Sequence, residues 1–198
     1  SQDLDMRGGG SIIGEEQSGF IREIGTELYH QLLEEEIIFQ KHKKLSNDGK
    51  NINNFQPVIK IPEEIYIPDD YIDDLDLRLS IYKRISNVTD YQELSNLSIE
   101  FADRFGPIPK PLDNLFNLIE LKILCISYNI EQLEFSRKGI VIGFYKNNPT
   151  NPEKLLSLTF NKNDHYSLRP DQKIFYDFRG YLNENRFNLA KKIITQIS

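Results

Sequence analysis

The spacing of apolar residues changes near residue 130, and this change limits most strongly what the chain can fold into. Before it, apolar side chains recur every three to four residues, which is typical of helices with one buried face. Helices are therefore predicted over 73–87, 90–105 and 111–129. Beyond it, short apolar runs bounded by turn residues indicate strands, until residues 183–197 return to helical spacing. This pattern predicts an α+β fold.

Short strands are predicted on both sides of the helical region. The predicted strands are 57–61, 131–136, 137–145, 155–160 and 173–178. Lys138-Gly139 is typical of a tight turn between two of them. We therefore expect residues 55–198 to form a compact domain of about three helices, a small and mainly antiparallel sheet, and a C-terminal helix.

The N-terminal quarter of the chain has a different character. Residues 1–19 are rich in glycine, which permits tight turns and close backbone approach, and residues 20–45 have the apolar spacing of one long helix. Residues 46–54 are polar, rich in asparagine and include a glycine, as expected of a linker. We expect a hairpin and long helix over 1–45, a linker over 46–54, and then the compact domain.

Charge is unevenly distributed along the 198 residues. Residues 1–129 contain 13 basic and 23 acidic side chains, whereas residues 130–198 contain 11 and 7. Phosphate binding depends on Lys and Arg, so the acidic part is a poor candidate for DNA binding. The mildly basic end leaves one alternative open, an accessory DNA-binding surface. Its candidate residues are Lys191, Lys192, Arg186 and Arg179.

Cellular location is indicated only indirectly. Cys125 is the single cysteine, so no disulfide can form within the chain. No apolar run approaches the roughly 20 residues that span a bilayer, and the first residues lack the pattern of a signal peptide. These features predict a cytoplasmic protein without a membrane partner.

Motifs for catalysis or metal binding are missing from the sequence. The phosphate-binding pattern G-x-x-x-x-G-K-[ST] does not occur. The three histidines lie far apart, and Cys125 lies between apolar residues of a predicted helix, as an inert buried thiol would. The acidic run 69–76 lacks the glycine and final glutamate of a calcium loop, which favours a solvated segment that caps the next helix. We expect no catalytic residue, metal or cofactor in this chain.

A long N-terminal motif resembles one that follows the second motor domain of the RecG and Mfd DNA translocases. The family pattern is roughly Asp-Leu-x-x-Arg-Gly-x-Gly-x-x-Leu-Gly-x-x-Gln-Ser-Gly. The matching positions are Asp3, Leu4, Arg7, Gly8, Gly10, Gly14, Gln17, Ser18 and Gly19. Gly9 and Ile13 depart mildly from the residues that the family usually has there.

Three further segments resemble Mfd, the bacterial transcription-repair coupling factors, and not RecG. They are IGTELYHQLLEEEI (24–37), IPDDYIDDLDLRLSIYKRIS (67–86) and EFADRFGPIP (100–109). The resemblance covers nearly the whole chain and is strongest up to about residue 145. It implies that the chain is the C-terminal region of such a factor.

That resemblance implies a function for the parent protein. Members of the family are ATP- and Mg-dependent translocases on double-stranded DNA that displace stalled RNA polymerase and recruit the UvrA–UvrB repair proteins. Their ATP motifs lie upstream, so this chain should not hydrolyse ATP. Its expected partners are the parent's own motor domains and N-terminal UvrB-like module.

Two sets of site residues follow from the resemblance. Arg7 and Gln17 correspond to residues that couple ATP hydrolysis to DNA movement, although Arg7 could simply pair with a neighbouring aspartate. Glu100, Asp103 and Arg104, called the charged ridge below, correspond to a surface that docks onto the UvrB-like module. Their i, i+3, i+4 spacing makes them neighbours on a helix. The alternative is a solvated face with an ordinary Glu100–Arg104 pair.

Overall fold

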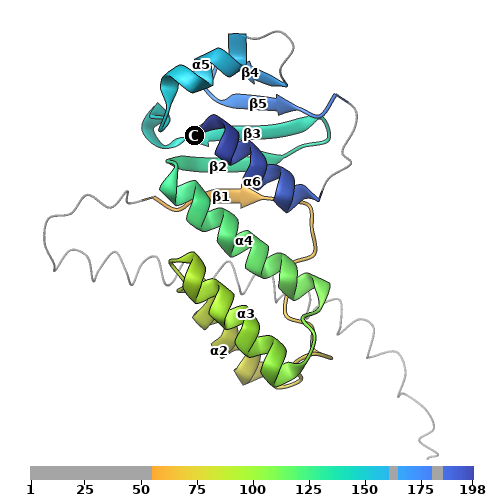
Figure 1. The fold of residues 1–198 in the computed structure, drawn as a ribbon. Helices are drawn as coiled ribbons and strands as arrows, with labels where there is room; N and C mark the ends of the chain where they lie inside the picture. The colour runs from red at the N-terminus through yellow and green to blue at the C-terminus, as the bar shows by residue number, and fades with distance from the viewer. Residues whose placement is uncertain (1–54, 161–164, 180–184) are drawn as a thin grey trace, which may run out of the picture.

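The computed structural model describes residues 55–160, 165–179 and 185–198. The predicted hairpin, long helix and linker, with Arg7 and Gln17, lie outside the described residues. No helix in the described part is long and apolar enough to cross a membrane. Within these residues the chain forms helices and one sheet, as an α+β fold requires (Figure 1).

A five-stranded mixed sheet has the order β1-β2-β3-β5-β4. β1 pairs in parallel with β2, and the other neighbouring strands pair antiparallel. The sheet is therefore mainly antiparallel, as predicted. The strands are β1 (Val58–Lys60), β2 (Ile130–Phe135), β3 (Gly139–Phe144), β4 (Tyr166–Leu168) and β5 (Ile174–Asp177).

Four helices agree with the predicted ones to within a few residues. They are α2 (Leu75–Ser86), α3 (Tyr91–Phe105), α4 (Lys110–Ser127) and α6 (Arg186–Ile197). Asp74 and Asp90 cap α2 and α3, because their side chains each accept a backbone N–H bond of 2.8 Å three residues later. Asp74, the last aspartate before α2, thus acts as expected for a capping segment. A short 3-10 turn, η1 (Tyr145–Asn147), follows β3.

The prediction of a strand at 155–160 is wrong, because these residues belong to helix α5 (Pro152–Phe160). Asn151 accepts a hydrogen bond from the Lys154 amide at 3.1 Å, and Pro152 suits the first helical position. Leu155 and Leu158 meet the core at helical spacing, and this pair was misread as part of a β run. Strand β4 was missed because it is short and only Tyr166 in it is buried.

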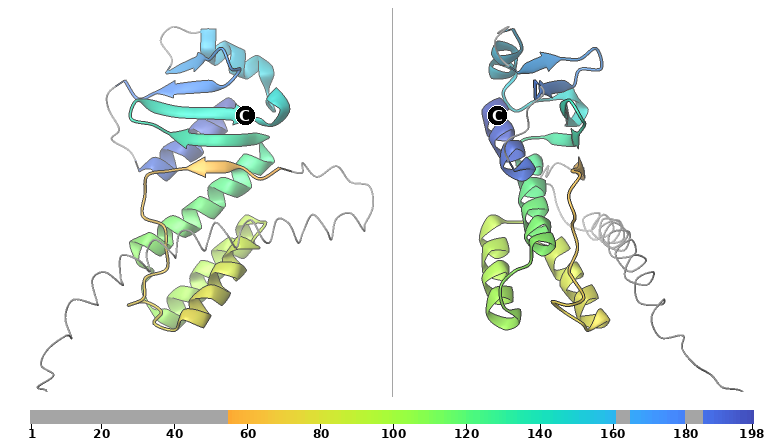
Figure 2. Two further views of the ribbon diagram at one scale, coloured as in Figure 1. Left: turned by 180° about the vertical axis from the view of Figure 1, so that it is seen from behind. Right: turned by 90° about the vertical axis from the view of Figure 1, so that its right-hand side faces the viewer.

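Helix α4 separates two hydrophobic cores and contributes to both. Its first half packs with α2 and α3, through residues that include Leu115, Phe116 and Ile119. Its second half packs with the sheet and α6 through Leu121 and Cys125. Figures 1 and 2 show α6 and the end of α4 on one face of the sheet, with α2 and α3 extending away from it.

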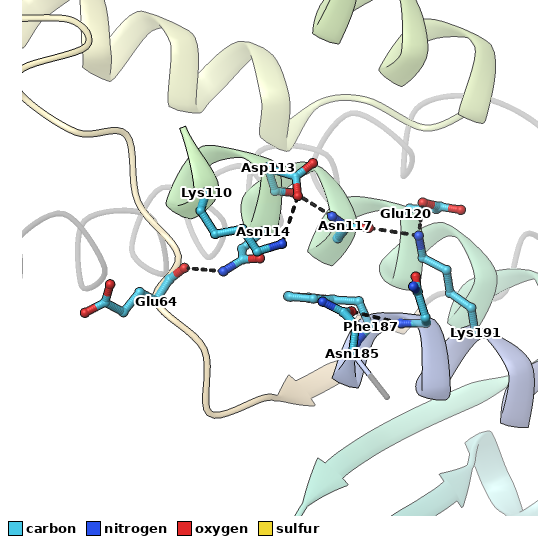
Figure 3. Close-up of polar contacts among 10 residues, drawn as sticks. Glu64, Lys110, Asp113, Asn114, Asn117, Glu120, Asn185, Phe187 and Lys191 are labelled. Atoms are coloured by element: carbon cyan, nitrogen blue, oxygen red, sulfur yellow. Dashed lines mark hydrogen bonds and ion pairs between the residues drawn. The ribbon is translucent and has the colours of Figure 1, made fainter. Parts of the chain in front are cut away.

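Polar contacts fix the junction between α4, α6 and the segment after β1. Lys191 of α6 donates to Asn117 Oδ1 at 2.9 Å and forms an ion pair with Glu120, both on α4 (Figure 3). Asn114 Nδ2 donates to the Glu64 carbonyl at 2.9 Å (Figure 3). These contacts orient the α2–α3 end relative to the sheet.

Gly139 begins β3 at a very close approach of two strands. A Cβ atom there would lie 2.0 Å from the Tyr176 backbone oxygen and 2.7 Å from the Phe175 ring. Gly143, on the same strand, has more room, because its nearest neighbour would be the Gln132 Cβ at 3.3 Å. Alanine substitution at these two glycines therefore compares a crowded position with a less crowded one on the same strand.

We expect Gly139→Ala to lower the free energy of unfolding by at least about 2 kcal/mol, because β3 and β5 must separate to admit the methyl group. Gly143→Ala should cost less than about 1 kcal/mol. Urea unfolding followed by circular dichroism measures both. Equal losses for the two variants would contradict this account of the sheet.

Candidate functional site

The charged ridge lies beside the buried face of α3. Leu94, Leu97 and Phe101 direct that neighbouring face of the helix into the core, and Phe101 is fully buried. Asp103 and Arg104 are exposed, while Glu100 is partly covered. The helical spacing therefore places the predicted residues together on the surface, as expected.

The end of α3 that carries the ridge is held firmly. The Tyr71 hydroxyl lies 3.2 Å from the Phe101 carbonyl and 2.9 Å from the Gly106 carbonyl. Gly106 ends the helix with φ of 91°, a conformation that favours glycine. The ridge is thus presented on a fixed helix and not on a loop.

Glu100 lies at the centre of an ion cluster that reaches a second helix. Arg84, in the last turn of α2, binds both carboxylate oxygens, with Nη1–Oε1 at 2.7 Å and Nη2–Oε2 at 2.5 Å. Arg104 adds a third contact, Nη1–Oε1 at 3.1 Å. We call Arg84, Glu100 and Arg104 the Glu100 cluster.

The cluster perturbs the ionisation of its members. The Arg84 hydrogen bonds, with a smaller contribution from Arg104, lower the pKa of Glu100 from 4.5 to about 2. The same contact raises the pKa of Arg84. Glu100 therefore stays ionised to lower pH than an ordinary glutamate, and with its two arginines the cluster carries one net positive charge at neutral pH.

The remaining ridge groups are available to a partner. The Asp103 side chain forms no hydrogen bond or ion pair with any residue in the described ranges. The Arg104 guanidinium lies over the Phe105 ring, 4.9 Å from its centroid, which holds the side chain near the surface. The ridge thus offers the Asp103 carboxylate and Arg104, with Arg84 of α2 at its edge, and both arginines are about half exposed. It is suited to polar recognition of another charged surface.

Arg84 was missed by the sequence analysis. If α2 and α3 were assumed to run side by side in opposite directions from their short connection, Arg84 would lie opposite Glu93 and not opposite Glu100. The signal available was weak: a basic last turn of α2 and acidic residues on the next helix. Only the packing of α2 and α3 around α4 shows which carboxylate Arg84 reaches.

The structure does not favour the basic alternative. Of its four candidate cations, Lys191 is paired with Glu120 and Arg186 with Glu63. These two side chains serve the junction of α6 with the rest of the domain, and so are not free to bind phosphate.

The potential metal ligands and the single thiol of the described part of the chain also bear on catalytic chemistry. No group of three or more potential metal ligands occurs among the residues that the structure describes. Cys125 is buried, and this burial raises the pKa of its thiol to about 12, which suits a packing role.

Comparisons with known proteins agree with one another. The TRCF domain model matches residues 61–155. Transcription-repair-coupling factors are similar to the chain, with 39% identity over 198 residues in Rickettsia conorii, covering all of this chain and 17% of the relative. The Escherichia coli factor is 35% identical over 168 residues, covering 85% of this chain and 14% of the relative. The chain thus spans about a sixth of the length of these relatives.

A solved structure shares the fold. The C-terminal domain of transcription-repair coupling factor has a TM-score of 0.59 and 18% identity, covering 72% of this chain and 90% of that one. This likeness supports the α+β architecture.

The Glu100 cluster should make stability depend on pH in the acid range. Because the folded pKa of Glu100 is lowered, its contribution is complete above about pH 4.5 and is lost as the pH falls towards 2. The difference in unfolding free energy between wild type and Glu100→Gln should therefore be constant near neutrality and shrink across this window. Denaturant unfolding at several pH values measures it, and a Glu100 carboxyl that titrates near 4.5 in NMR spectra would contradict the cluster.

Proposed function

Because this chain belongs to the transcription-repair coupling factor family, we propose that it is the C-terminal regulatory region of a longer ATP-dependent DNA translocase. That parent would displace stalled RNA polymerase from double-stranded DNA and recruit UvrA and UvrB in the cytoplasm. The chain itself would not hydrolyse ATP. It would instead control when the parent's motor and repair surfaces are active.

The observation that supports this role most directly is the charged ridge on α3. It lies at the end of the domain away from the sheet, on a helix fixed by a buried core. We propose that the ridge docks onto the parent's N-terminal UvrB-like module. Docking would cover the UvrA-binding surface and restrain the motor, and engagement with polymerase or DNA would favour the undocked state.

A polar surface suits such a reversible contact. Exposed ion pairs contribute only about 0.2–1 kcal/mol each, so a few of them hold two modules without fixing them permanently. Contacts between domains within one chain are generally of this polar kind and permit relative motion. A modest difference in affinity for polymerase or DNA can then shift the population between docked and undocked states.

The N-terminal part would have a separate task. We propose that residues 1–45 form a motor appendage in which Arg7 and Gln17 couple ATP hydrolysis to DNA movement. Residues 46–54 would connect it to the regulatory domain over 55–198. This division rests on the sequence motif, because residues 1–54 lie outside the described residues.

Reversing the ridge charges in the full-length parent tests the docking role. Glu100→Lys combined with Asp103→Lys should weaken docking, because two carboxylates become cations. We expect basal ATP turnover and UvrA binding both to rise several-fold, measured by phosphate release and by pull-down.

The control for this experiment is Glu153→Lys, which changes the charge of an exposed residue on α5, an element that packs at the sheet and not at the ridge. It should leave both activities at wild-type values. Wild-type turnover and UvrA binding in the ridge variant would rule out the docking role.

A further inference from the structure

Arg84 occupies most of the carboxylate on which the ridge is centred. A carboxylate offers about four positions for hydrogen-bond donors. Arg84 fills two of them and Arg104 fills a third. A cation from a docking partner that approaches Glu100 therefore meets an acceptor that is already largely occupied.

Arg84 can leave this position without damaging the fold. Its side chain is 52% exposed, so the guanidinium can turn into water. The position of α3 depends instead on buried residues such as Leu97 and Phe101 and on the hydrogen bonds from Tyr71. Arg84 therefore occupies the Glu100 carboxylate without being needed to build the helix.

We propose that Arg84 is an intramolecular competitor for the Glu100 carboxylate, and that this competition limits how strongly the ridge docks. The inference rests on the proposed docking function. Docking would exchange the Arg84–Glu100 pair for a contact with a cationic group of the partner. The net gain is then the difference between two ion pairs, which keeps the docked state easy to release.

The neighbouring residue provides a matched control. Lys83 lies in the same turn of α2, is exposed, and has no polar side-chain contact within the described part of the chain. Lys83→Gln removes one positive charge from this turn, as Arg84→Gln does, but leaves the Glu100 cluster intact. Any difference in binding between the two variants therefore comes from loss of the Arg84–Glu100 contact and not from loss of one positive charge in this turn.

The test measures binding of this 198-residue chain to the parent's separately purified UvrB-like module, by isothermal titration calorimetry at low salt. Arg84→Gln should lower the Kd about two- to fivefold, the range expected for loss of one competing exposed ion pair. Lys83→Gln should leave the Kd nearly unchanged. Glu100→Lys should weaken binding.

Two further measurements check the Arg84→Gln variant itself. NMR titration should show a Glu100 pKa higher than in wild type, and thermal melting should show that the variant remains folded.

The outcomes separate the two ideas. If Glu100→Lys weakens binding but Arg84→Gln weakens it too, or has no more effect than Lys83→Gln, the competitor role is overturned and docking stands. If wild type and all variants fail to bind, or if Glu100→Lys binds as wild type does, the proposed docking function itself is overturned.

Discussion

The whole structure depends on the burial of α4 on two sides. An 18-residue helix is about 27 Å long, enough to contact two separate groups of apolar side chains along its length. Leu115 and Ile119 lie in the core with α2 and α3, whereas Leu121 and Cys125 lie in the core with the sheet. Because one rigid helix belongs to both cores, neither the ridge nor the sheet can shift without disturbing α4.

This arrangement explains how a weakly interacting surface can still be well defined. The energy that fixes α3 comes from apolar burial behind it, so the ridge charges need contribute little to stability. They remain exposed at the surface, and their low individual strength would allow the proposed interdomain contact to open. The lowered pKa of Glu100 extends the range in which its carboxylate is charged to more acidic pH than an ordinary glutamate allows.

Much of the fold could be predicted because its signals are local. Apolar spacing located α2 and α3, the acidic segment before α2 was expected to cap it, and Lys138-Gly139 indicated a turn between β2 and β3. The prediction for residues 155–160 was wrong because a short apolar run fits the spacing of either a helix or a strand. Strand β4 was not predicted because three residues are too few to show an alternating pattern. At the site, the spacing of Glu100 and Arg104 was readable from one helix. Arg84 was not, because its pairing depends on how two helices pack.

The parallel pairing of β1 with β2 has a consequence for the order of assembly. Lys60 and Glu134, which are register partners, are 74 residues apart, and all of α2, α3 and α4 lie between them. Pairing two strands so far apart in sequence costs chain entropy before their contacts form, and this cost is smaller once the intervening chain is compact. During synthesis, β1 must therefore wait for α2, α3, α4 and β2 to emerge from the ribosome. Until then, Val58 and Ile59 are an unpaired apolar segment that a chaperone could bind.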